Sequence, residues 1–561
     1  MDTRPWHQHY SPGVPTEIDL EEVPLSRYLE RTAARVPGRV AVSFKNCTLT
    51  YAALKSVAER LATAMQGMGI GPGKSVAIQL PNIPQTVIAT QAALMTGARV
   101  VMTNPLYTER EIEHQWNDAE VDLAITADFI WVARVRAMRE RLPAKNYIIA
   151  TIPEYLKFPL NLLAPLKLKK ATPPLFAKFK EEAGVFRFKK LVHSTVANLK
   201  PVDVSMDDIA LLQYTGGTTG VSKGAMLTHR NIAANVHQIH AWFSGMQYGE
   251  EVLLTALPIF HVFGLTVCTT FGIWFGAELA LVANPRDFKS VVDTVVKRGV
   301  TLFPAVPAMF NALNNYPGIE NIDVSSIKAC FSGSAPITPE ILERFEKLTK
   351  SRILEGFGMS ESSPVTHVNP IRGLRKIGTV GIPVSSTDAR IVDADDSTKV
   401  LATGEEGELV IRGPQVMPGY WKREGETAKT IIDGWLHTGD LASMDADGFF
   451  KIVGRKKDMI NCNGMKVYPD EVDAVLMAHP KILEATTIGI PHPERIETVK
   501  SFIVLLPGES LTAEEIEAYT RENLASYKIP REIEFIDELP KSTVLKVLRR
   551  ELRDRELAKR S

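Results

Sequence analysis

The chain has 561 residues, more than one hydrophobic core usually serves, so at least two domains are expected. Apolar residues make up 45% and charged residues 23%, values typical of an ordinary globular protein. Basic and acidic residues number 65 each, so the overall charge gives no reason to expect nucleic acid as a partner. The four cysteines are widely separated and lack metal-ligand spacing, which argues against a zinc site or a disulfide framework.

The first residues are polar and acidic and contain no apolar stretch with a cleavage site, so we expect a cytoplasmic protein. Residues 265–283 are long enough to span a membrane, but Glu278 and small residues interrupt them. We therefore interpret this stretch as a buried core segment.

Apolar runs of strand length alternate with helical patterns along most of the chain. Residues 76–80 predict a strand, and residues 84–96 predict the helix that follows it. Further buried strands are predicted at 301–303, 329–331 and 352–355, each leading into a glycine-containing turn. This order indicates an α/β fold with mostly parallel sheets, in which ligands bind at strand ends.

After about residue 400 the pattern changes to short β segments with Gly and Asp turns, which predicts a β-rich subdomain. From Gly454 a compact α/β pattern of about 100 residues follows, a normal domain size. We expect a large N-terminal domain over 1–453, built from two α/β subdomains and the β-rich subdomain. A small mobile C-terminal α/β domain over 454–561 completes the chain.

Residues 153–190 combine leucine and phenylalanine with many lysines and few acidic residues. A basic and apolar surface of this kind can bind anionic lipid headgroups, which would place the protein peripherally on the inner face of the cell membrane. A solvated surface insertion with a locally packed apolar face explains the composition equally well.

The run from Tyr214 to Gly224 follows an apolar strand and is rich in glycine and threonine. Glycines let backbone N–H groups turn toward an anion, threonine hydroxyls add donors, and Lys223 adds a positive charge. This composition suits a triphosphate better than a plain glycine turn. The mononucleotide P-loop ends in Gly-Lys-Ser/Thr, whereas Lys223 stands between Ser222 and Gly224, so that motif is absent.

With Thr228-His229-Arg230-Asn231 behind it, this loop resembles the signature of the adenylate-forming superfamily of acyl-CoA synthetases, adenylation domains and luciferases. Further motifs follow in family order and cover nearly the whole chain: Pro258 to His261, Ser332 to Pro336, Glu355 to Glu361, Trp435 to Asp440, and Leu539 to Arg550. The resemblance implies ATP, Mg²⁺ and coenzyme A as cofactors or co-substrates.

The resemblance assigns roles residue by residue. His261 borders the acyl pocket, Phe357 stacks on adenine, and Ser360 offers a hydroxyl to phosphate. Glu361 holds magnesium with Thr218. Asp440 and Arg455 bind the ribose, and Lys457 is the hinge of the small domain. The implied contacts with nucleotide or coenzyme A are Tyr214, Thr215, Gly216, Gly217, Thr218, Thr219, Gly220, Lys223, Gly224, Gly333, Ser334, Ala335, Gly356, Phe357, Gly358, Ser360, Asp440, Ile452, Arg455, Asn461, Gly464 and Lys466.

Lys546 matches the adenylation lysine, which neutralises charge as a carboxylate attacks the α-phosphate. We therefore expect Lys546, Glu361 and His261 to be the catalytic residues. Phe357 and Ser360 stand where the family more often has Tyr and Thr, which retains the ring and the hydroxyl, and Leu545 and Ile496 stand where glycine is common. Leu545 restricts the backbone beside the lysine, which bears on adenylation geometry.

Within the superfamily the chain is most similar to bacterial long-chain fatty acyl-CoA synthetases, on residues 104–111, 261–266 and 284–287. The implied substrate is a medium- or long-chain fatty acid, which the apolar run after His261 suits. Alternatives are a ligase for aryl or other acids, a catalytically silent acyl-binding homologue and a phosphotransferase or NTPase. A homodimer is compatible with the resemblance, and the sequence does not determine it.

Overall fold

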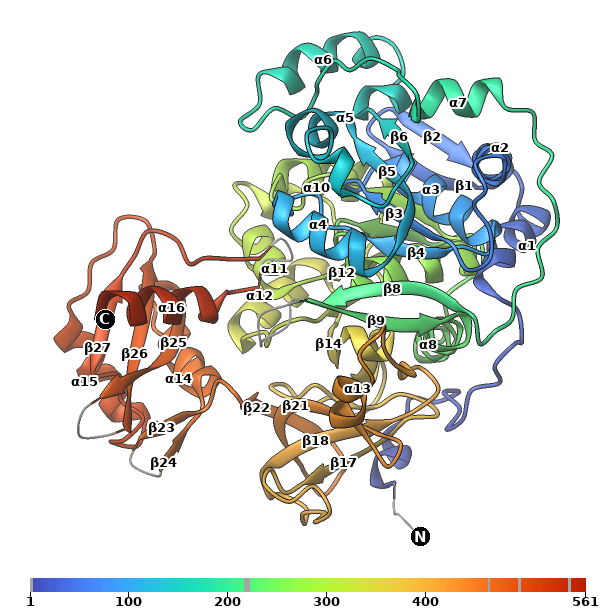
Figure 1. Ribbon diagram of the computed structural model, residues 1–561. Coiled ribbons are helices and arrows are strands. Elements are labelled where there is room, and N and C mark those ends of the chain that lie inside the picture. Colours follow the sequence, from blue (N-terminus) through green and yellow to red (C-terminus); the bar gives the residue numbers. More distant parts are fainter. Residues whose placement is uncertain (1–3, 216–221, 463–464, 493–495, 543–545, 561) are drawn as a thin grey trace.

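The computed structural model describes residues 4–215, 222–462, 465–492, 496–542 and 546–560. Two large sheets with their helices form the main body, a β-rich unit lies beneath them in the view of Figure 1, and a C-terminal unit stands to one side. The structure is α/β with mostly parallel sheets and a smaller C-terminal domain, as the sequence predicts.

The first large sheet has eight strands in the order β19-β9-β8-β4-β3-β5-β6-β7. Strands β8, β4, β3, β5, β6 and β7 run parallel, whereas β9 and β19 are antiparallel additions at one edge. The strands are β3 (Ser75–Gln79), β4 (Arg99–Met102), β5 (Val121–Ala127), β6 (Asn146–Ala150), β7 (Val185–Arg187), β8 (Ile209–Thr215), β9 (Lys223–Thr228) and β19 (Gly419–Tyr420).

The second large sheet has nine strands in the order β16-β15-β14-β13-β12-β10-β11-β1-β2. Its centre, from β14 to β1, is parallel. The strands are β1 (Val40–Phe44), β2 (Cys47–Thr50), β10 (Val252–Thr255), β11 (Glu278–Leu281), β12 (Leu302–Ala305), β13 (Ala329–Ser332), β14 (Ile353–Gly358), β15 (Val365–Val368) and β16 (Ile382–Pro383).

Helix α3 (Pro84–Met95) packs against α2 (Tyr51–Gly67) and contacts strands of both large sheets. Every residue of α3 is buried, which explains why its sequence contains no charged residue; its two glutamines, Gln85 and Gln91, are buried with the rest. The remaining helices of the main body are α1 (Tyr28–Arg35), α4 (Glu109–Asp118), α5 (Asp128–Ile130), α6 (Leu160–Lys169), α7 (Phe188–Ser194), α8 (His229–Trp242), α9 (Phe271–Phe275), α10 (Phe288–Arg298), α11 (Pro307–Asn314) and α12 (Pro339–Thr349), with a π-helix η6 (Phe263–Thr270) and short 3₁₀ turns that include η5 (Ile152–Tyr155) and η8 (Ser360–Ser362).

The β-rich unit is a five-stranded sheet made of β17 (Asp388–Val392), β18 (Gly407–Arg412), β20 (Ile431–Ile432), β21 (Trp435–Met444) and β22 (Phe450–Arg455), with α13 (Glu424–Thr430) beside it. The C-terminal unit contains β23 (Ile460–Cys462), β24 (Met465–Val467), β25 (Ile482–His492), β26 (Ile496–Leu505), β27 (Glu532–Phe535), α14 (Pro469–Met477), α15 (Ala513–Asn523) and α16 (Arg549–Arg560). One hydrophobic core runs from Trp6 to Phe450, whereas the C-terminal unit has clusters of its own.

Three details of the sequence prediction are wrong. Strand β12 leads into α11 at Pro307 rather than into a glycine turn, and β14 continues through Gly356 and Gly358 as a strand. The β-rich sheet begins with β17 at Asp388, before residue 400. The boundary at 453/454 and the hinge at Lys457 stay predictions.

The stretch 265–283 is a core segment, as predicted, and it folds into η6, α9 and β11 with nearly all residues buried. Within the described ranges, no helix combines the length and the apolar character needed to cross a bilayer.

Candidate functional site

The glycine-rich loop begins where strand β8 ends, as the sequence predicts. Strands β8 and β9 form a hairpin in which Thr215 pairs with Lys223 and Tyr214 with Gly224. The Tyr214 hydroxyl donates a hydrogen bond to Asp118 Oδ2 at 2.7 Å, and a Cβ atom at Gly224 would lie 3.1 Å from the Tyr214 ring. The predicted contacts Gly216, Gly217, Thr218, Thr219 and Gly220 lie outside the described residues.

A chain of contacts connects this hairpin to Glu361. Lys223 forms an ion pair with Glu426 of α13, and its Nζ atom lies 5.4 Å from the centre of the Tyr420 ring. The Tyr420 hydroxyl donates to Glu361 Oε1 at 2.7 Å. The expected phosphate-binding lysine and the expected metal carboxylate therefore lie at the two ends of one contact network.

The Thr228-His229-Arg230-Asn231 motif joins β9 to the rest of the site. Thr228 caps α8 by accepting the Asn231 N–H, and Asn231 Oδ1 accepts the Thr228 N–H. Asn231 Nδ2 donates to the carbonyls of Pro414 and Val416, both at 2.9 Å. Burial lowers the pKa of His229 to about 4, so this ring is neutral at physiological pH. The motif positions the hairpin and the segment that leads to Tyr420.

The predicted adenine turn follows β13. Ser334 has a φ of 73°, a left-handed conformation that non-glycine residues rarely adopt and that occurs at functional sites. A Cβ atom at Gly333 would lie 3.2 Å from the Phe263 ring, so the turn packs tightly on η6. Ser332 Oγ is buried and has no hydrogen-bond partner among the described residues. Ala335 continues the turn.

Strand β14 brings the next group of predicted residues beside this turn. Gly356 and Gly358 allow close strand contacts, since a Cβ atom at Gly358 would lie 2.0 Å from the Pro364 carbonyl oxygen. Phe357 is half-buried, and its ring meets His367 edge-to-face at 6.1 Å. Burial raises the pKa of Glu355 to about 8, and Glu355 Oε1 accepts the Ile337 N–H at 3.3 Å. Ser360 and Glu361 follow on η8.

Asp440 and Arg455 face each other across the β21–β22 pair. Arg455 Nε lies 2.9 Å from Asp440 Oδ1, while Asp440 Oδ2 is buried without a hydrogen-bond partner in the described part of the chain. Burial raises the pKa of Asp440 and the Arg455 charge opposes this shift. An unsatisfied buried carboxylate oxygen is costly, and a ligand hydroxyl would satisfy it. Ile452 is half-buried on β22.

Lys546 lies within electrostatic range of Asp440, Arg455 and His261 although it belongs to the C-terminal unit. Lys546 as a whole keeps exposed surface. Desolvation of its ammonium by the surrounding protein is the main reason why the pKa of that group is lowered to about 8, and the positive charge of Arg455 adds to the shift. Burial, with a smaller effect from Lys546, lowers the pKa of His261 to about 4. The neighbouring Leu545 lies outside the described residues.

The residues implied in the thioester step lie on β23 and β24, apart from the predicted nucleotide site. Asn461 is on β23, where its N–H donates to Glu497 Oε2 at 2.9 Å, and Lys466 is exposed on β24. Figure 1 places β23 and β24 at the lower end of the C-terminal unit, away from the β8–β9 hairpin. Gly464 lies outside the described residues. The structure thus brings Lys546, but not Lys466, to the predicted nucleotide site.

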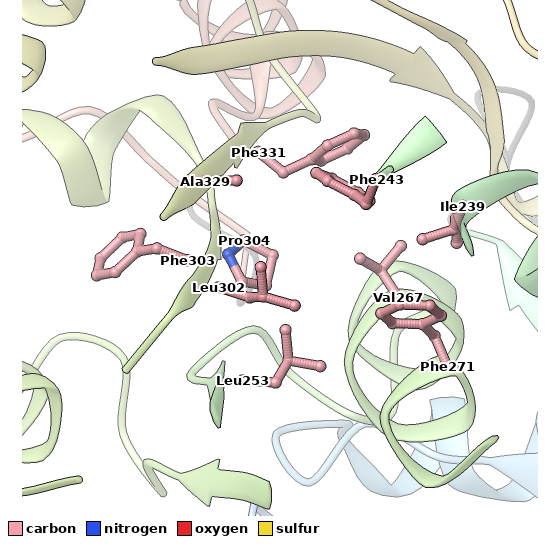
Figure 2. Close-up of a pocket in the computed structure, with 10 residues that line it drawn as sticks. All are labelled: Ile239, Phe243, Leu253, Val267, Phe271, Leu302, Phe303, Pro304, Ala329 and Phe331. Atoms are coloured by element: carbon pink, nitrogen blue, oxygen red, sulfur yellow. The ribbon is translucent and has the colours of Figure 1, made fainter. Parts of the chain in front are cut away.

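An apolar cavity adjoins the adenine turn. Figure 2 shows its wall, formed by side chains from α8, η6, α9 and the strands β10, β12 and β13: Ile239, Phe243, Leu253, Val267, Phe271, Leu302, Phe303, Pro304, Ala329 and Phe331. Phe331 contacts Phe263 of η6, with ring centres 5.8 Å apart. The cavity measures about 20 Å³, room for about one water molecule, so side chains must move before an alkyl chain enters.

Sequence reasoning missed Tyr420 and Glu426. Tyr420 is 59 residues from Glu361, and Glu426 is 203 residues from Lys223, so no local pattern connects either pair. The available signal was the glycine-aromatic run Pro418-Gly419-Tyr420-Trp421, which suggests a close backbone approach.

The order of these motifs and their meeting point define an adenylate-forming enzyme. Residues 29–421 match the family model for the AMP-binding enzyme, and residues 471–546 match the model for the AMP-binding enzyme C-terminal domain. The chain therefore belongs to the AMP-binding enzyme family.

Individual relatives match over nearly the whole chain. A long-chain-fatty-acid–CoA ligase of Bacillus subtilis is 41% identical over 558 residues, which cover 99% of this chain and 98% of the relative. A protein of the same name from Escherichia coli O157:H7 is 38% identical and covers 98% of each chain. The crystal structure of ATP-bound MatB from Rhodopseudomonas palustris superimposes with a TM-score of 0.82 at 26% identity, covering 94% of this chain and 98% of that structure.

Proposed function

We propose that the protein is an AMP-forming fatty acid:CoA ligase. In the first half-reaction, an oxygen of the fatty acid carboxylate attacks the α-phosphorus of ATP, and pyrophosphate leaves. In the second, the thiol of coenzyme A attacks the carbonyl carbon of the acyl-AMP, and AMP leaves. The observation that carries the proposal is Asp440, a buried carboxylate with one oxygen that has no partner among the described residues and that lies in the same electrostatic environment as Lys546 and Glu361.

The nucleotide is held from three sides. Asp440 Oδ2 accepts from the ribose hydroxyls, and Arg455 keeps Oδ1 in place. The turn Gly333-Ser334-Ala335 and the Phe357 ring bind adenine, for which a π face is suited. The loop Tyr214–Gly224, with Lys223, grips the phosphates, and Ser360 adds a hydroxyl.

Lys546 stabilises the charge that develops on the α-phosphate during attack. A positive charge held close to Asp440 and Arg455 stabilises the transition state electrostatically. Little reorganisation is needed during the reaction, because the charge is already in place. His261 is neutral, because its pKa is lowered to about 4, and it borders the acid rather than adding charge.

Magnesium is the implied metal. Among the described residues, no group of three or more His, Cys, Asp or Glu side chains is arranged to hold a metal ion. This fits Mg²⁺, which commonly uses one or two carboxylates and completes its shell with water and substrate phosphates. Glu361 would hold it with Thr218, and the ion would neutralise phosphate charge.

The alkyl chain enters beside η6. The wall of the cavity in Figure 2 is apolar on every side, and each buried methylene contributes about 0.8 kcal/mol. The relatives named as long-chain-fatty-acid–CoA ligases support this substrate class.

The thioester step uses Asn461, Gly464 and Lys466 after the domain 454–561 rotates about Lys457. The fatty acids of this reaction partition into lipid, so we also propose a peripheral contact with the inner face of the cell membrane. A homodimer remains compatible with this function, and no step of the reaction requires one.

Pyrophosphate release with a panel of fatty and aryl acids, measured with and without coenzyme A, tests the function. We expect release that depends on a fatty acid, and AMP as the nucleotide product. ADP or orthophosphate would indicate a phosphotransferase or NTPase, no product a silent homologue, and a preference for aryl acids a different ligase.

Asp440→Asn provides the site-specific arm of this experiment. Hydrogen bonds to charged groups contribute about 1.5–3 kcal/mol, so KM for ATP should rise roughly ten- to hundredfold. Asp447→Asn is the matched control, because Asp447 is half-buried and pairs with Lys376 away from the proposed site. An unchanged KM in Asp440→Asn would remove Asp440 from the ribose site.

A further inference from the structure

Helix α6 and the residue before its N-cap expose an unusual amount of apolar surface. Phe158 is 76% exposed, Leu162 64%, Leu163 56% and Leu166 67%. Leu168, on the same helix, packs against the main core and holds α6 to the protein. The helix lies at the outer edge of the main body in Figure 1. Exposed clusters of large apolar side chains commonly mark sites of interaction with another protein or with a membrane.

The charges beside these residues have one sign. Between Tyr155 and Lys180 the chain contains no acidic residue, and its lysines are Lys157, Lys167, Lys169, Lys170, Lys178 and Lys180. None of them forms an ion pair within the described residues, although Lys167 lies within electrostatic range of Asp287. The next acidic residues along the chain do not neutralise these lysines, because Glu181 pairs with Lys190 and Glu182 pairs with Arg139.

The segment is fixed to the fold on both sides of the helix. Asn46 Oδ1 accepts the Lys157 N–H and Asn46 Nδ2 donates to the Lys157 carbonyl, both at 3.0 Å. After the helix, the Ala177 N–H donates to the buried Asp128 at 2.8 Å. The leucines are therefore presented by an anchored element, and changing them leaves the core packing untouched.

We propose that α6 and Phe158 dock the protein on an anionic lipid surface. The leucines and Phe158 insert at the level of the headgroups, and the exposed lysines at the end of α6, Lys167, Lys169 and Lys170, lie against the lipid phosphates. This arrangement specifies the element behind the proposed peripheral contact. This docking proposal rests on the proposed function in one respect, namely that the membrane supplies the fatty acid substrate. The docking itself needs neither ATP nor substrate.

The charge pattern favours lipid over a second copy of the chain. In a two-fold symmetric dimer the same patch meets itself, so the unpaired lysines of both copies would face each other. An anionic bilayer instead supplies the opposite charge over the whole surface. Each lysine near such a surface strengthens binding by about fivefold at low salt.

Co-sedimentation of the full-length protein with vesicles tests this proposal. We expect binding to mixed phosphatidylglycerol–phosphatidylcholine vesicles that weakens as salt is raised, and much weaker binding to phosphatidylcholine alone. Leu162→Ser with Leu166→Ser should reduce binding by at least roughly tenfold, since two inserted side chains are lost. Lys169→Gln with Lys170→Gln should reduce it by about fivefold for each lysine.

Matched variants separate docking from general surface effects. Val196→Ser with Val400→Ser removes two exposed apolar side chains elsewhere, and Lys347→Gln with Lys350→Gln removes two exposed lysines on α12. Both controls should bind vesicles as the unchanged protein does. Equal binding by the α6 variants, or equal binding to both vesicle types, overturns the proposal.

Two further measurements make the result unambiguous. Thermal melting should be unchanged in the leucine variant because both side chains are exposed. A dimer in sedimentation that Leu162→Ser with Leu166→Ser converts to a monomer would assign the surface to self-association and overturn lipid docking. Pyrophosphate release with a short water-soluble acid should stay unchanged in all four variants, which keeps failure of docking distinct from failure of the ligase activity.

Discussion

The charge on Lys546 changes with pH within an ordinary assay range. Its pKa is lowered to about 8, so the ammonium is protonated below pH 8 and neutral above it. Since kcat/KM reports groups of the free enzyme, kcat/KM for acyl-AMP formation should fall as pH rises through about 8. Lys546→Arg should remove this decline, because a guanidinium stays charged. The thioester step from supplied acyl-AMP serves as the control and should not show the same decline.

Lys223 is paired with Glu426, so in the proposed site Glu426 would compete with the triphosphate for this lysine. The ion pair is partly exposed, so it contributes at most about 1 kcal/mol. Glu426→Gln frees the lysine and removes a negative charge, and ATP should bind up to about fivefold more tightly in calorimetry. Glu424→Gln, on the same helix α13, is the matched control. Weaker binding in Glu426→Gln would mean that the carboxylate orients the lysine instead.

At the scale of elements, the first turn of η6 packs directly on the segment that carries His261. A Cβ atom at Gly264 would lie 2.3 Å from the Pro258 carbonyl oxygen, too close for any side chain. Gly264→Ala should force the two segments apart, cost about 1–3 kcal/mol of stability and raise KM for the fatty acid more than KM for ATP. Thermal melting and steady-state kinetics measure both effects.

Gly67→Ala at the end of α2 is the comparison for this change. No atom lies within 4 Å of a Cβ there, so stability and both KM values should stay nearly constant. A Gly264→Ala protein with unchanged melting would show that the π-helix adjusts without strain.

Local patterns predicted the elements well and their contacts poorly. The helical pattern of residues 84–96 identified α3, and the alternation of strands and helices identified parallel sheets, because both signals arise from neighbouring residues. Sheet order depends on distant pairing, and nothing in the sequence places β19 beside β9. An apolar run cannot distinguish a π-helix from an α-helix, so η6 was described only as buried.

In the candidate site, too, the sequence predicted the residues but not the contacts between them. Asp440 and Arg455 are 15 residues apart, and the β21–β22 register that places them opposite each other is visible only in the structure. Ile496 had no interpretation from sequence, yet its φ of 63° explains why glycine is common there. A β-branched side chain is strained in this conformation, and the 62% exposure of Ile496 does not relieve the strain, because the clash is with the residue's own backbone.

At the scale of the whole molecule, the C-terminal unit has its own hydrophobic clusters, and of its two proposed functional groups only Lys546 lies at the proposed nucleotide site. Lys546 lies in the electrostatic environment of Asp440, whereas β23 and β24 lie at the lower end of the unit in Figure 1. With the proposed roles of these residues, a single rigid arrangement would not serve both half-reactions. The proposed rotation about Lys457 would exchange the two groups.

Two single variants test this exchange. Lys546→Ala should abolish acyl-AMP formation, measured as pyrophosphate release, and leave thioester formation from supplied acyl-AMP. Lys466→Ala should do the reverse, because Lys466 is exposed on β24 and would meet the site only after the proposed rotation. Each variant is the control for the other, since both remove one ammonium from the same domain. Equal loss of both half-reactions in either variant would contradict the division of labour and leave one conformation responsible for the whole reaction.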